Sequence, residues 1–240
     1  MINTRKHLTL IIILTALTIQ HQTFAQSSRY KMALPPYEFQ FPRDHASHPD
    51  YRTEWWYYTG HLKSEDHSFG YELTFFQVGI NPMRRMGGSS WALHTMFFAH
   101  FAVTDETGET FYHTETIGRP ALKMAGGLED RYKVWIGKWS AELLDDDKTH
   151  RLTAQGPESA ISLDLVSAKS PVIHGHDGVS RKADGEGRAS HYYSLTRLET
   201  SGTLTLNGEE HTVTGLSWMD HEFGTNQLTS RQQGLDWFSI

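Results

Sequence analysis

The chain reads Glu54-Trp55-Trp56-Tyr57-Tyr58-Thr59-Gly60-His61-Leu62 shortly after a polar, proline-containing segment. Aromatic residues dominate this stretch, and such residues fit the pleated surface of a β-sheet. A polar loop over 63–70 separates it from a second stretch of the same kind over 71–80. Together the two stretches predict a β-hairpin.

Period-two patterning continues through most of the remaining sequence. Further strands are expected over 91–104, 110–116, 131–144, 151–155, 160–166, 190–198 and 201–206. Asn207-Gly208 predicts a tight hairpin turn into a strand over 211–218, because both central positions of such a turn need positive φ. Many short strands without a long amphipathic helix predict an all-β, antiparallel barrel or sandwich. The Gly-rich, charged segment 174–190 is expected to be a long mobile loop and a candidate lid.

The first residues have the pattern of a secretory signal peptide. Arg5 and Lys6 precede an apolar run over 8–19, and Thr23-Phe24-Ala25 places small residues around a cleavage site. The apolar run is too short to span a bilayer comfortably, although an uncleaved N-terminal anchor is the alternative. We therefore expect a signal peptide over 1–25 and an exported protein, periplasmic or extracellular.

The composition excludes several classes of function. The formal net charge is −6, and no basic patch is evident, so nucleic acid is a poor candidate partner. The chain has no cysteine, which excludes disulfides, thiolate metal sites and a cysteine nucleophile. The many aromatic residues predict a large core or an apolar pocket.

Two further segments bear on domain organisation. Residues 26–50 are polar and contain several prolines, which predicts an extended arm leading into the domain. The sequence ends in Gly234-Leu235-Asp236-Trp237-Phe238-Ser239-Ile240, which resembles the first half of a strand. Either a terminal strand enters the barrel, or the sequence is a fragment of a longer protein, and we favour the fragment.

The stretch Ser217-Trp218-Met219-Asp220-His221-Glu222-Phe223-Gly224 is where chemistry is expected. It places an acid, an imidazole and a second acid beside large apolar side chains. Desolvation and neighbouring charge shift pKa values most strongly in such surroundings.

Two segments together resemble the AttH-like branch of the carotenoid 1,2-hydratase (hydroxyneurosporene synthase) family. The first runs from His48-Pro49 through Glu54–Leu62 to Phe69–Phe76. The second runs from Ser190-His191-Tyr192-Tyr193-Ser194 through Gly202-Thr203-Leu204 to Gly215–Gly224. The resemblance spans about residues 45–240.

The resemblance implies two lipocalin-like antiparallel β domains packed together. The first would cover 51–224, and the second would begin over 225–240 and be mostly missing, so that packing on the missing β domain is expected. It also implies an apolar, isoprenoid-like or lipid-like ligand, and members of the family are described as hydratases, secreted hydrolases and, more distantly, pericyclases. In the carotenoid hydratases of this family, the stretch that corresponds to 218–224 resembles Tyr-His-Asp-His-Asn-Trp-Gly. This chain keeps the Asp-His pair but has Met219 in place of the first His and Glu222 in place of the Asn.

Four titratable residues are the candidate catalytic groups. Asp220 would be the acid that protonates an alkene carbon, with His221 and either Glu222 or Glu54 tuning it or relaying protons. Each has a structural alternative. Asp220 and His221 would form a hydrogen-bonded corner of the barrel, and Glu54 would form a buried ion pair, for which Arg52 and Arg197 are candidates.

The candidate ligand-binding residues surround that motif in the expected fold. They are Trp56, Tyr58, His94, Tyr192 and Trp218. The aromatic side chains of the first strand are also good core residues, and a single histidine on a strand is commonly a core residue. His174-Gly175-His176-Asp177 resembles a metal-binding run, but a solvated loop explains it better. We expect no metal and no cofactor.

Two hypotheses of different classes follow. In the first, the protein is an exported enzyme, a hydro-lyase or hydrolase, that acts on an apolar substrate by acid–base chemistry. The hydrolase version lacks a Gly-x-Ser-x-Gly nucleophile motif. In the second, the protein is a non-catalytic lipid carrier of the cell envelope. Peripheral contact with a membrane is left open.

Overall fold

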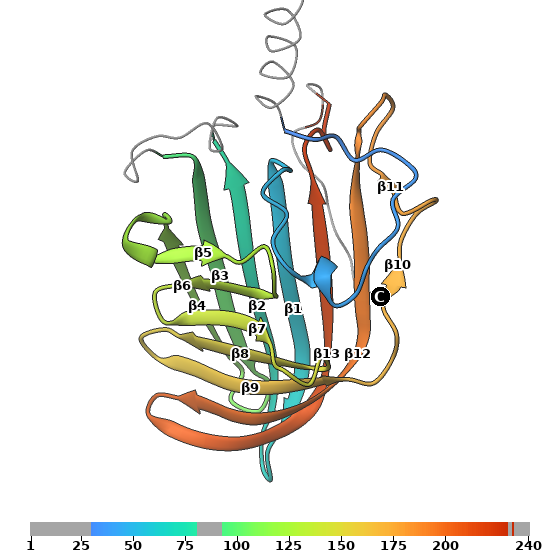
Figure 1. The fold of residues 1–240 in the computed structure, drawn as a ribbon. Helices are drawn as coiled ribbons and strands as arrows, with labels where there is room; N and C mark the ends of the chain where they lie inside the picture. Colours follow the sequence, from blue (N-terminus) through green and yellow to red (C-terminus); the bar gives the residue numbers. More distant parts are fainter. Residues whose placement is uncertain (1–29, 81–92, 230–231, 233–240) are drawn as a thin grey trace, which may run out of the picture.

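The computed structural model describes residues 30–80, 93–229 and 232 (Figure 1). The expected signal peptide and the C-terminal run 233–240 lie outside these residues. The described part is almost entirely antiparallel β-structure, which confirms the predicted all-β class. The elements are η1 (Arg43–His45), β1 (Thr53–Lys63), β2 (Ser68–Gly79), β3 (Thr95–Asp105), β4 (Thr110–Gly118), η3 (Ala121–Lys123), β5 (Ala125–Gly127), β6 (Lys133–Ile136), β7 (Trp139–Leu143), β8 (Thr149–Gln155), β9 (Ser159–Ser167), β10 (Val172–Ile173), β11 (Ser180–Arg181), β12 (Ala189–Leu206) and β13 (Glu209–Gly224). No helix in the described residues is long and apolar enough to cross a membrane.

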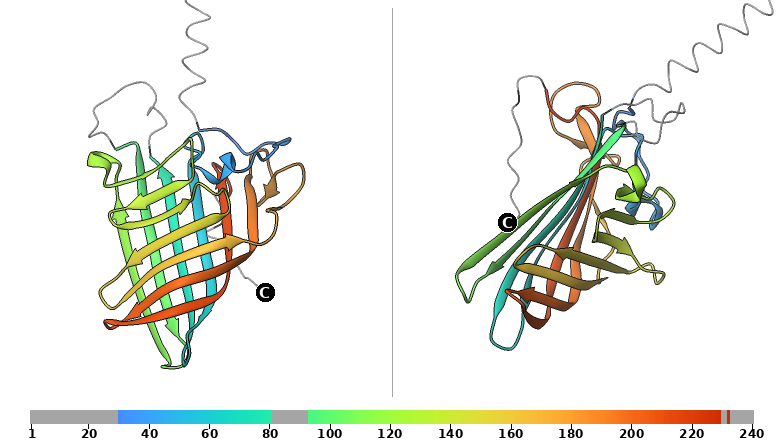
Figure 2. Two further views of the ribbon diagram at one scale, coloured as in Figure 1. Left: turned by 60° about the horizontal axis from the view of Figure 1, so that its bottom comes forward. Right: turned by 90° about the vertical axis from the view of Figure 1, so that its left-hand side faces the viewer.

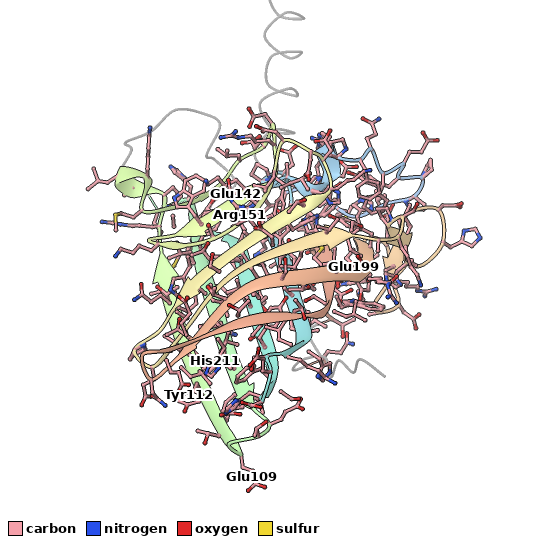
Figure 3. All side chains as sticks on the ribbon, turned by 90° about the horizontal axis from the view of Figure 1, so that it is seen from below. Glu109, Tyr112, Glu142, Arg151, Glu199 and His211 are labelled. Atoms are coloured by element: carbon pink, nitrogen blue, oxygen red, sulfur yellow. The ribbon has the colours of Figure 1, made fainter. Side chains whose placement is uncertain are left out.

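The strands form one sheet in the order β4-β3-β2-β1-β13-β12-β9-β8-β7-β6-β5. The sheet folds over on itself, so that β5–β9 cross one face of β1–β4 (Figures 1 and 2). The two ends of the sheet approach each other where a Cβ on Gly118 of β4 would lie 2.8 Å from the Ala125 Cβ of β5. At the lower rim, Asn207 of the β12–β13 turn donates a hydrogen bond to the Tyr112 hydroxyl of β4 at 2.9 Å. Tyr112 and His211 mark this rim in Figure 3. The result is a nearly closed barrel.

Strand alternation explains the core. In β1 every second residue from Glu54 to Leu62 is buried and points inward, while Trp55, Tyr57 and Thr59 are half-buried on the outer face. The β1–β2 hairpin forms as predicted, with Trp56 opposite Phe75 and Tyr58 opposite Leu73. The inward residues of both layers meet in one hydrophobic core, and their removal from water is the main stabilising contribution.

The longest strands differ from the sequence-based prediction. The expected strands over 190–198 and 201–206 are one continuous strand, β12, which is irregular between Leu195 and Leu198. Such an irregularity bends a strand, and it separates the part of β12 that pairs with β10 and β11 from the part that pairs with β9. β13 continues to Gly224, so Asp220, His221 and Glu222 lie within the strand and not beyond its end.

Two segments expected to be loosely attached pack on the barrel. The arm over 30–50 crosses the inner side of the sheet, where the Tyr37 ring stacks on His191 at 4.0 Å. The 174–190 segment contains β11, which pairs with β12, and Gly178 accepts a hydrogen bond from the His191 ring at 2.9 Å. The predicted loop is therefore tied to the sheet at several points.

Candidate functional site

The Asp220-His221-Glu222 motif is divided between the two faces of the sheet, because successive residues of a strand point to opposite sides. His221 pairs with Trp56 and Tyr193 on the inner face. Asp220 pairs with Tyr57 and Ser194 on the outer face. The three titratable residues therefore belong to two separate clusters and do not form one catalytic group.

The outer cluster is built around the Asp220 carboxylate. Its Oδ1 accepts hydrogen bonds from the Tyr192 hydroxyl at 2.9 Å, from the Trp218 indole N–H at 2.9 Å and from the Ser194 hydroxyl. Its Oδ2 is buried and has no hydrogen-bond partner among the described residues. The shared orientation of Asp220 and Trp218 that strand alternation predicts is confirmed. A buried carboxylate oxygen without a partner is costly, and this atom is the chemically distinctive feature of the outer face.

A histidine extends the outer cluster toward the barrel rim. The His174 Nε2 lies 2.6 Å from the Ser194 hydroxyl, and its ring stacks on Tyr192 at 4.1 Å. Because the Ser194 hydroxyl donates to Asp220, it accepts from His174. Burial lowers the pKa of His174. The resulting chain runs His174–Ser194–Asp220, with the serine in the middle, so the serine is not activated as a nucleophile.

Glu222 lies next to Asp220 on the outer face and is also buried. Its Oε1 accepts a hydrogen bond from the Ser190 hydroxyl at 2.5 Å and pairs with the Lys182 ammonium at 2.9 Å. Lys182 also lies 4.9 Å from the centre of the Tyr192 ring. Burial raises the pKa of Glu222 in spite of these two stabilising partners.

Replacing Lys182 with Met is expected to raise the pKa of Glu222 further, because the variant removes the cation that stabilises the carboxylate. A ¹³C NMR titration of the carboxyl group would measure this. Arg181→Met is the control, since Arg181 is exposed and pairs with Asp184. An unchanged Glu222 titration in Lys182→Met would show that the ion pair does not form in solution.

The inner cluster is built around the Glu54 carboxylate at the start of β1. Its Oε1 accepts from His48 Nδ1 and from His221 Nε2, each at 2.8 Å. Its Oε2 accepts from the His48 backbone N–H at 2.8 Å and from Gln77 Nε2 at 3.2 Å. Glu54 is thus an ion-pair residue, as its structural alternative predicts, but histidines replace the expected arginines.

The charges in the inner cluster follow from these contacts. Burial alone would raise the pKa of Glu54, but His48 and His221 outweigh it and lower that pKa to about 2. Burial would lower the pKa of His48, but Glu54 and Asp44 outweigh it and raise that pKa. Burial lowers the pKa of His221. Both ring nitrogens of His48 also face carboxylate oxygens, Nδ1 that of Glu54 at 2.8 Å and Nε2 that of Asp44 at 3.4 Å. These contacts and pKa directions favour a Glu54 carboxylate, a protonated His48 and a neutral His221.

His48, Glu54 and His221 are also the described residues best placed to hold a metal ion. One ligand atom from each lies within 4.8 Å of the other two. Every one of these atoms already has a hydrogen bond, and the three side chains are buried. A metal ion here would have to displace these hydrogen bonds and the proton that His48 shares with Glu54 and Asp44. The donor set is therefore explained by hydrogen bonding.

The candidate binding residues are also distributed between the faces. Trp56 and Tyr58 are fully buried in the core. The Trp56 N–H donates to the His45 carbonyl at 3.0 Å. Trp218 and Tyr192 belong to the outer cluster. His94 lies just before β3, and no hydrogen bond described in the structure connects it to either cluster. Its Nδ1 is buried and has no partner among the residues that the structure describes.

Sequence reasoning missed several residues that the two clusters depend on. In the outer cluster these are His174, Lys182, Ser190 and Ser194, which lie far from Asp220 in the sequence. In the inner cluster they are Asp44, His45, His48 and Tyr193. Residues 220–222 are a candidate site because titratable residues are dense there. The arm has a similar density at Arg43-Asp44-His45 and His48, so the same criterion also indicates the arm.

The fold and these clusters define the class of protein: a nearly closed, antiparallel, lipocalin-like β-barrel with buried polar clusters on both faces of one sheet. The profile of the AttH-like family matches residues 32–240. The chain belongs to the AttH-like family, which confirms the resemblance seen in the sequence.

Two solved structures illustrate the relationship. A candidate AttH from Nitrosomonas europaea is similar with a TM-score of 0.72 and 28% identity, over 81% of this chain and 58% of the other. Kievitone hydratase from Nectria haematococca has a TM-score of 0.56 and 13% identity, over 82% of this chain and 55% of the other, and so shares the fold. This chain thus spans little more than half the length of these relatives. No curated protein sequence matches it significantly.

Proposed function

We propose that this protein is an exported, hydratase-type enzyme that acts on an apolar, isoprenoid-like or lipid-like small molecule, with Asp220 as the acid. The observation that carries the proposal is the state of the Asp220 carboxyl group. One oxygen accepts three hydrogen bonds, and the other is buried with no hydrogen-bond partner in the described part of the chain. That second oxygen is the atom from which a proton would be transferred.

The reaction is the addition of water to a carbon–carbon double bond. In the proposed step a hydrogen is transferred from Asp220 Oδ2 to one alkene carbon, and the π-bond electrons form the new C–H bond. The neighbouring carbon becomes a cation, to which a water molecule adds. The water then loses a proton to the Asp220 carboxylate, so that the acid is regenerated and atoms and charge balance. Such positioned proton transfer contributes about 10²–10⁴-fold to a rate.

The surroundings of Asp220 support an apolar substrate with a cationic intermediate. Trp218 and Tyr192 hydrogen-bond to Oδ1, and Tyr57 lies opposite on β1. These three aromatic side chains are half-buried on the outer face. Aromatic faces attract cations and provide apolar contact area. The three donors on Oδ1 also hold the carboxyl group in one orientation, so the proton is directed from Oδ2.

Asp220→Asn is expected to reduce conversion by at least about 100-fold while the protein stays folded. The asparagine Oδ1 keeps all three donors, and its amide nitrogen occupies the Oδ2 position, where it has no transferable proton. The measurement is mass spectrometry of small molecules that copurify with the full-length protein, before and after incubation. A product heavier by one water identifies hydration.

Asp164→Asn is the matched control, because Asp164 is a half-exposed strand aspartate that pairs with Arg151. It should convert the substrate normally. If Asp220→Asn is as active as the wild-type protein, the assignment of the acid is wrong. Equal, unchanged ligand from both proteins would instead favour the second candidate, a lipid carrier of the cell envelope.

The carrier function is supported by one observation: Asp220 Oδ1 ties β12 and β13 together, as a structural corner would. In that case the aromatic residues of the outer face bind a ligand without changing it. A hydrolase is less well supported, because Ser194 donates its hydroxyl hydrogen to Asp220 and is not the donor in its contact with His174.

A further inference from the structure

A cavity of about 470 Å³ opens on the inner side of the sheet, remote from the Asp220 face. It lies between the arm, the start of β8 and the segment that follows β9. Its apolar wall includes Phe41, Pro42 and Leu195, and its inner end includes His45 and His150. Lys148 and Lys169 lie at the exposed rim. The volume is within the roughly 300–1,000 Å³ typical of small-molecule sites.

A chain of hydrogen bonds fixes which nitrogen of His45 carries the hydrogen. Neutral His221 donates from Nε2 to Glu54, so its Nδ1 must accept. The Tyr193 hydroxyl, 3.0 Å from that Nδ1, therefore donates to it. The oxygen of Tyr193 then accepts from His45 Nδ1 at 2.6 Å. Burial lowers the pKa of His45 well below its usual value, so the ring is neutral and its Nε2 is left as an acceptor.

A second chain fixes His150 in the opposite tautomer. The Tyr58 hydroxyl lies 2.8 Å from the Tyr132 hydroxyl and 3.0 Å from His150 Nδ1. Only one arrangement gives an acceptor to both hydroxyl hydrogens: Tyr132 donates to Tyr58, and Tyr58 donates to His150 Nδ1. Burial lowers the pKa of His150 to about 4, so this ring is also neutral. Its Nε2 therefore carries the hydrogen and is a donor.

We propose that this cavity is a binding site for a ring-sized apolar molecule with a hydroxyl group, an alcohol or phenol, which donates to His45 Nε2 and accepts from His150 Nε2–H. The two rings lie at the same end of the cavity, with centroids 5.4 Å apart and planes nearly perpendicular. A hydroxyl oxygen both donates and accepts, which matches this pair. Phe41, Pro42 and Leu195 contact the apolar body. The buried Glu54 cluster maintains this pattern, because it fixes the tautomer of His221.

The first test measures the tautomers without any ligand. Long-range ¹H–¹⁵N NMR spectra of the full chain distinguish Nδ1–H from Nε2–H imidazoles. We expect His45 as the Nδ1–H form and His150 as the Nε2–H form at neutral pH. Tyr193→Phe should change the His45 pattern and leave that of His150 unchanged. Tyr71→Phe is the matched control, since it removes another buried hydroxyl, bonded to Ser217. The reverse tautomer at either histidine would overturn the proposal.

The second test titrates phenol into the same protein, with anisole as a probe that lacks the hydroxyl hydrogen. Phenol should bind at least about fivefold more tightly than anisole, as expected for the loss of one hydrogen bond. His45→Phe should abolish that difference, and Tyr71→Phe should retain it. Equal affinity for phenol and anisole, or no binding of either, would show that the cavity is not such a site. Should His45→Phe fail to fold, Tyr193→Phe gives the same comparison with the His45 ring in place. None of these outcomes depends on Asp220.

Discussion

Replacing Glu54 with Gln is expected to lower the free energy of unfolding by about 4 kcal/mol, because the variant removes the carboxylate to which both buried histidines donate and leaves His48 with the longer contact to Asp44 at 3.4 Å. Glu54 Oε1 accepts from His48 Nδ1 and His221 Nε2, and Oε2 accepts from the His48 backbone and Gln77. In either orientation of the glutamine amide, its NH₂ group faces groups that themselves donate hydrogen bonds, so those bonds are lost. Such a loss is a large part of the roughly 5–15 kcal/mol that stabilises a typical domain.

Urea denaturation of the full chain would measure this effect. Glu106→Gln is the control, since Glu106 is half-exposed and pairs with the exposed His61 at 3.4 Å; we expect a change within about 0.5 kcal/mol. Ser47→Ala is a milder variant within the cluster, because it removes a hydroxyl 2.8 Å from Gln77, and about 1 kcal/mol is expected. A Glu54→Gln protein as stable as the control would mean that the buried cluster does not stabilise the fold.

The protein is expected to lose about 3 kcal/mol of stability between pH 6.5 and pH 4 through His150 alone. Burial lowers the pKa of this histidine from 6.5 to about 4 in the folded state. The unfolded chain therefore binds a proton below pH 6.5 that the folded chain binds only below about pH 4. Stability from this group is complete above pH 6.5 and decreases as the pH falls. His45 and His221, whose pKa values are also lowered, act in the same direction.

His48 acts in the opposite direction. Its pKa is raised in the folded state, so its contribution is complete below pH 6.5 and is lost as the pH rises through the folded value. Glu54, with a pKa lowered to about 2, contributes fully above about pH 4.5 and loses that contribution as the pH falls toward 2. The His150 contribution is therefore lost between about pH 6.5 and 4, below the pH at which the His48 contribution is lost, and His45 and His221 also lose stability below pH 6.5.

His150→Asn isolates the His150 contribution. The asparagine Oδ1 can accept from the Tyr58 hydroxyl as Nδ1 does, and it does not titrate. Denaturation at pH 7.5 gives the cost of the substitution itself. Between pH 6.5 and 4, the free energy of unfolding should then change less steeply with pH in the variant than in the wild-type protein. The difference in slope should correspond to the uptake of up to one proton on unfolding. Parallel slopes in the two proteins would show that His150 is not held neutral in the folded state.

The sequence predicts the fold class well because alternation is a local property. The aromatic stretch over 54–62 specifies β1 whatever its neighbours are, and the same alternation specifies that Asp220 and Trp218 share a face. Strand ends are less well predicted. β13 continues through Gly224 and β12 continues past Leu198, because pairing with neighbouring strands supplies hydrogen bonds that propensity alone cannot anticipate.

The candidate site is only partly predictable. Asp220 and Glu54 are singled out by their aromatic neighbours in the sequence. Several of their partners are not, because those partners come from the arm, from the segment before β12 and from β12 itself. His48 reaches Glu54 only when the arm folds over the sheet. His174 reaches Ser194 only because β10 pairs with β12.

The sequence by itself determined an all-β barrel of the AttH-like family and an ionisable motif near the end of its last described strand. Only the tertiary structure decided that the motif is divided, with Asp220 and Glu222 on the outer face and His221 inside beside Glu54. The physical reason is that strand alternation specifies which residues share a face, while the folding of the sheet and the path of the arm specify what each face contacts. Within residues 30–80 and 93–229, those contacts leave one oxygen of Asp220 without a hydrogen-bond partner and satisfy both oxygens of Glu54.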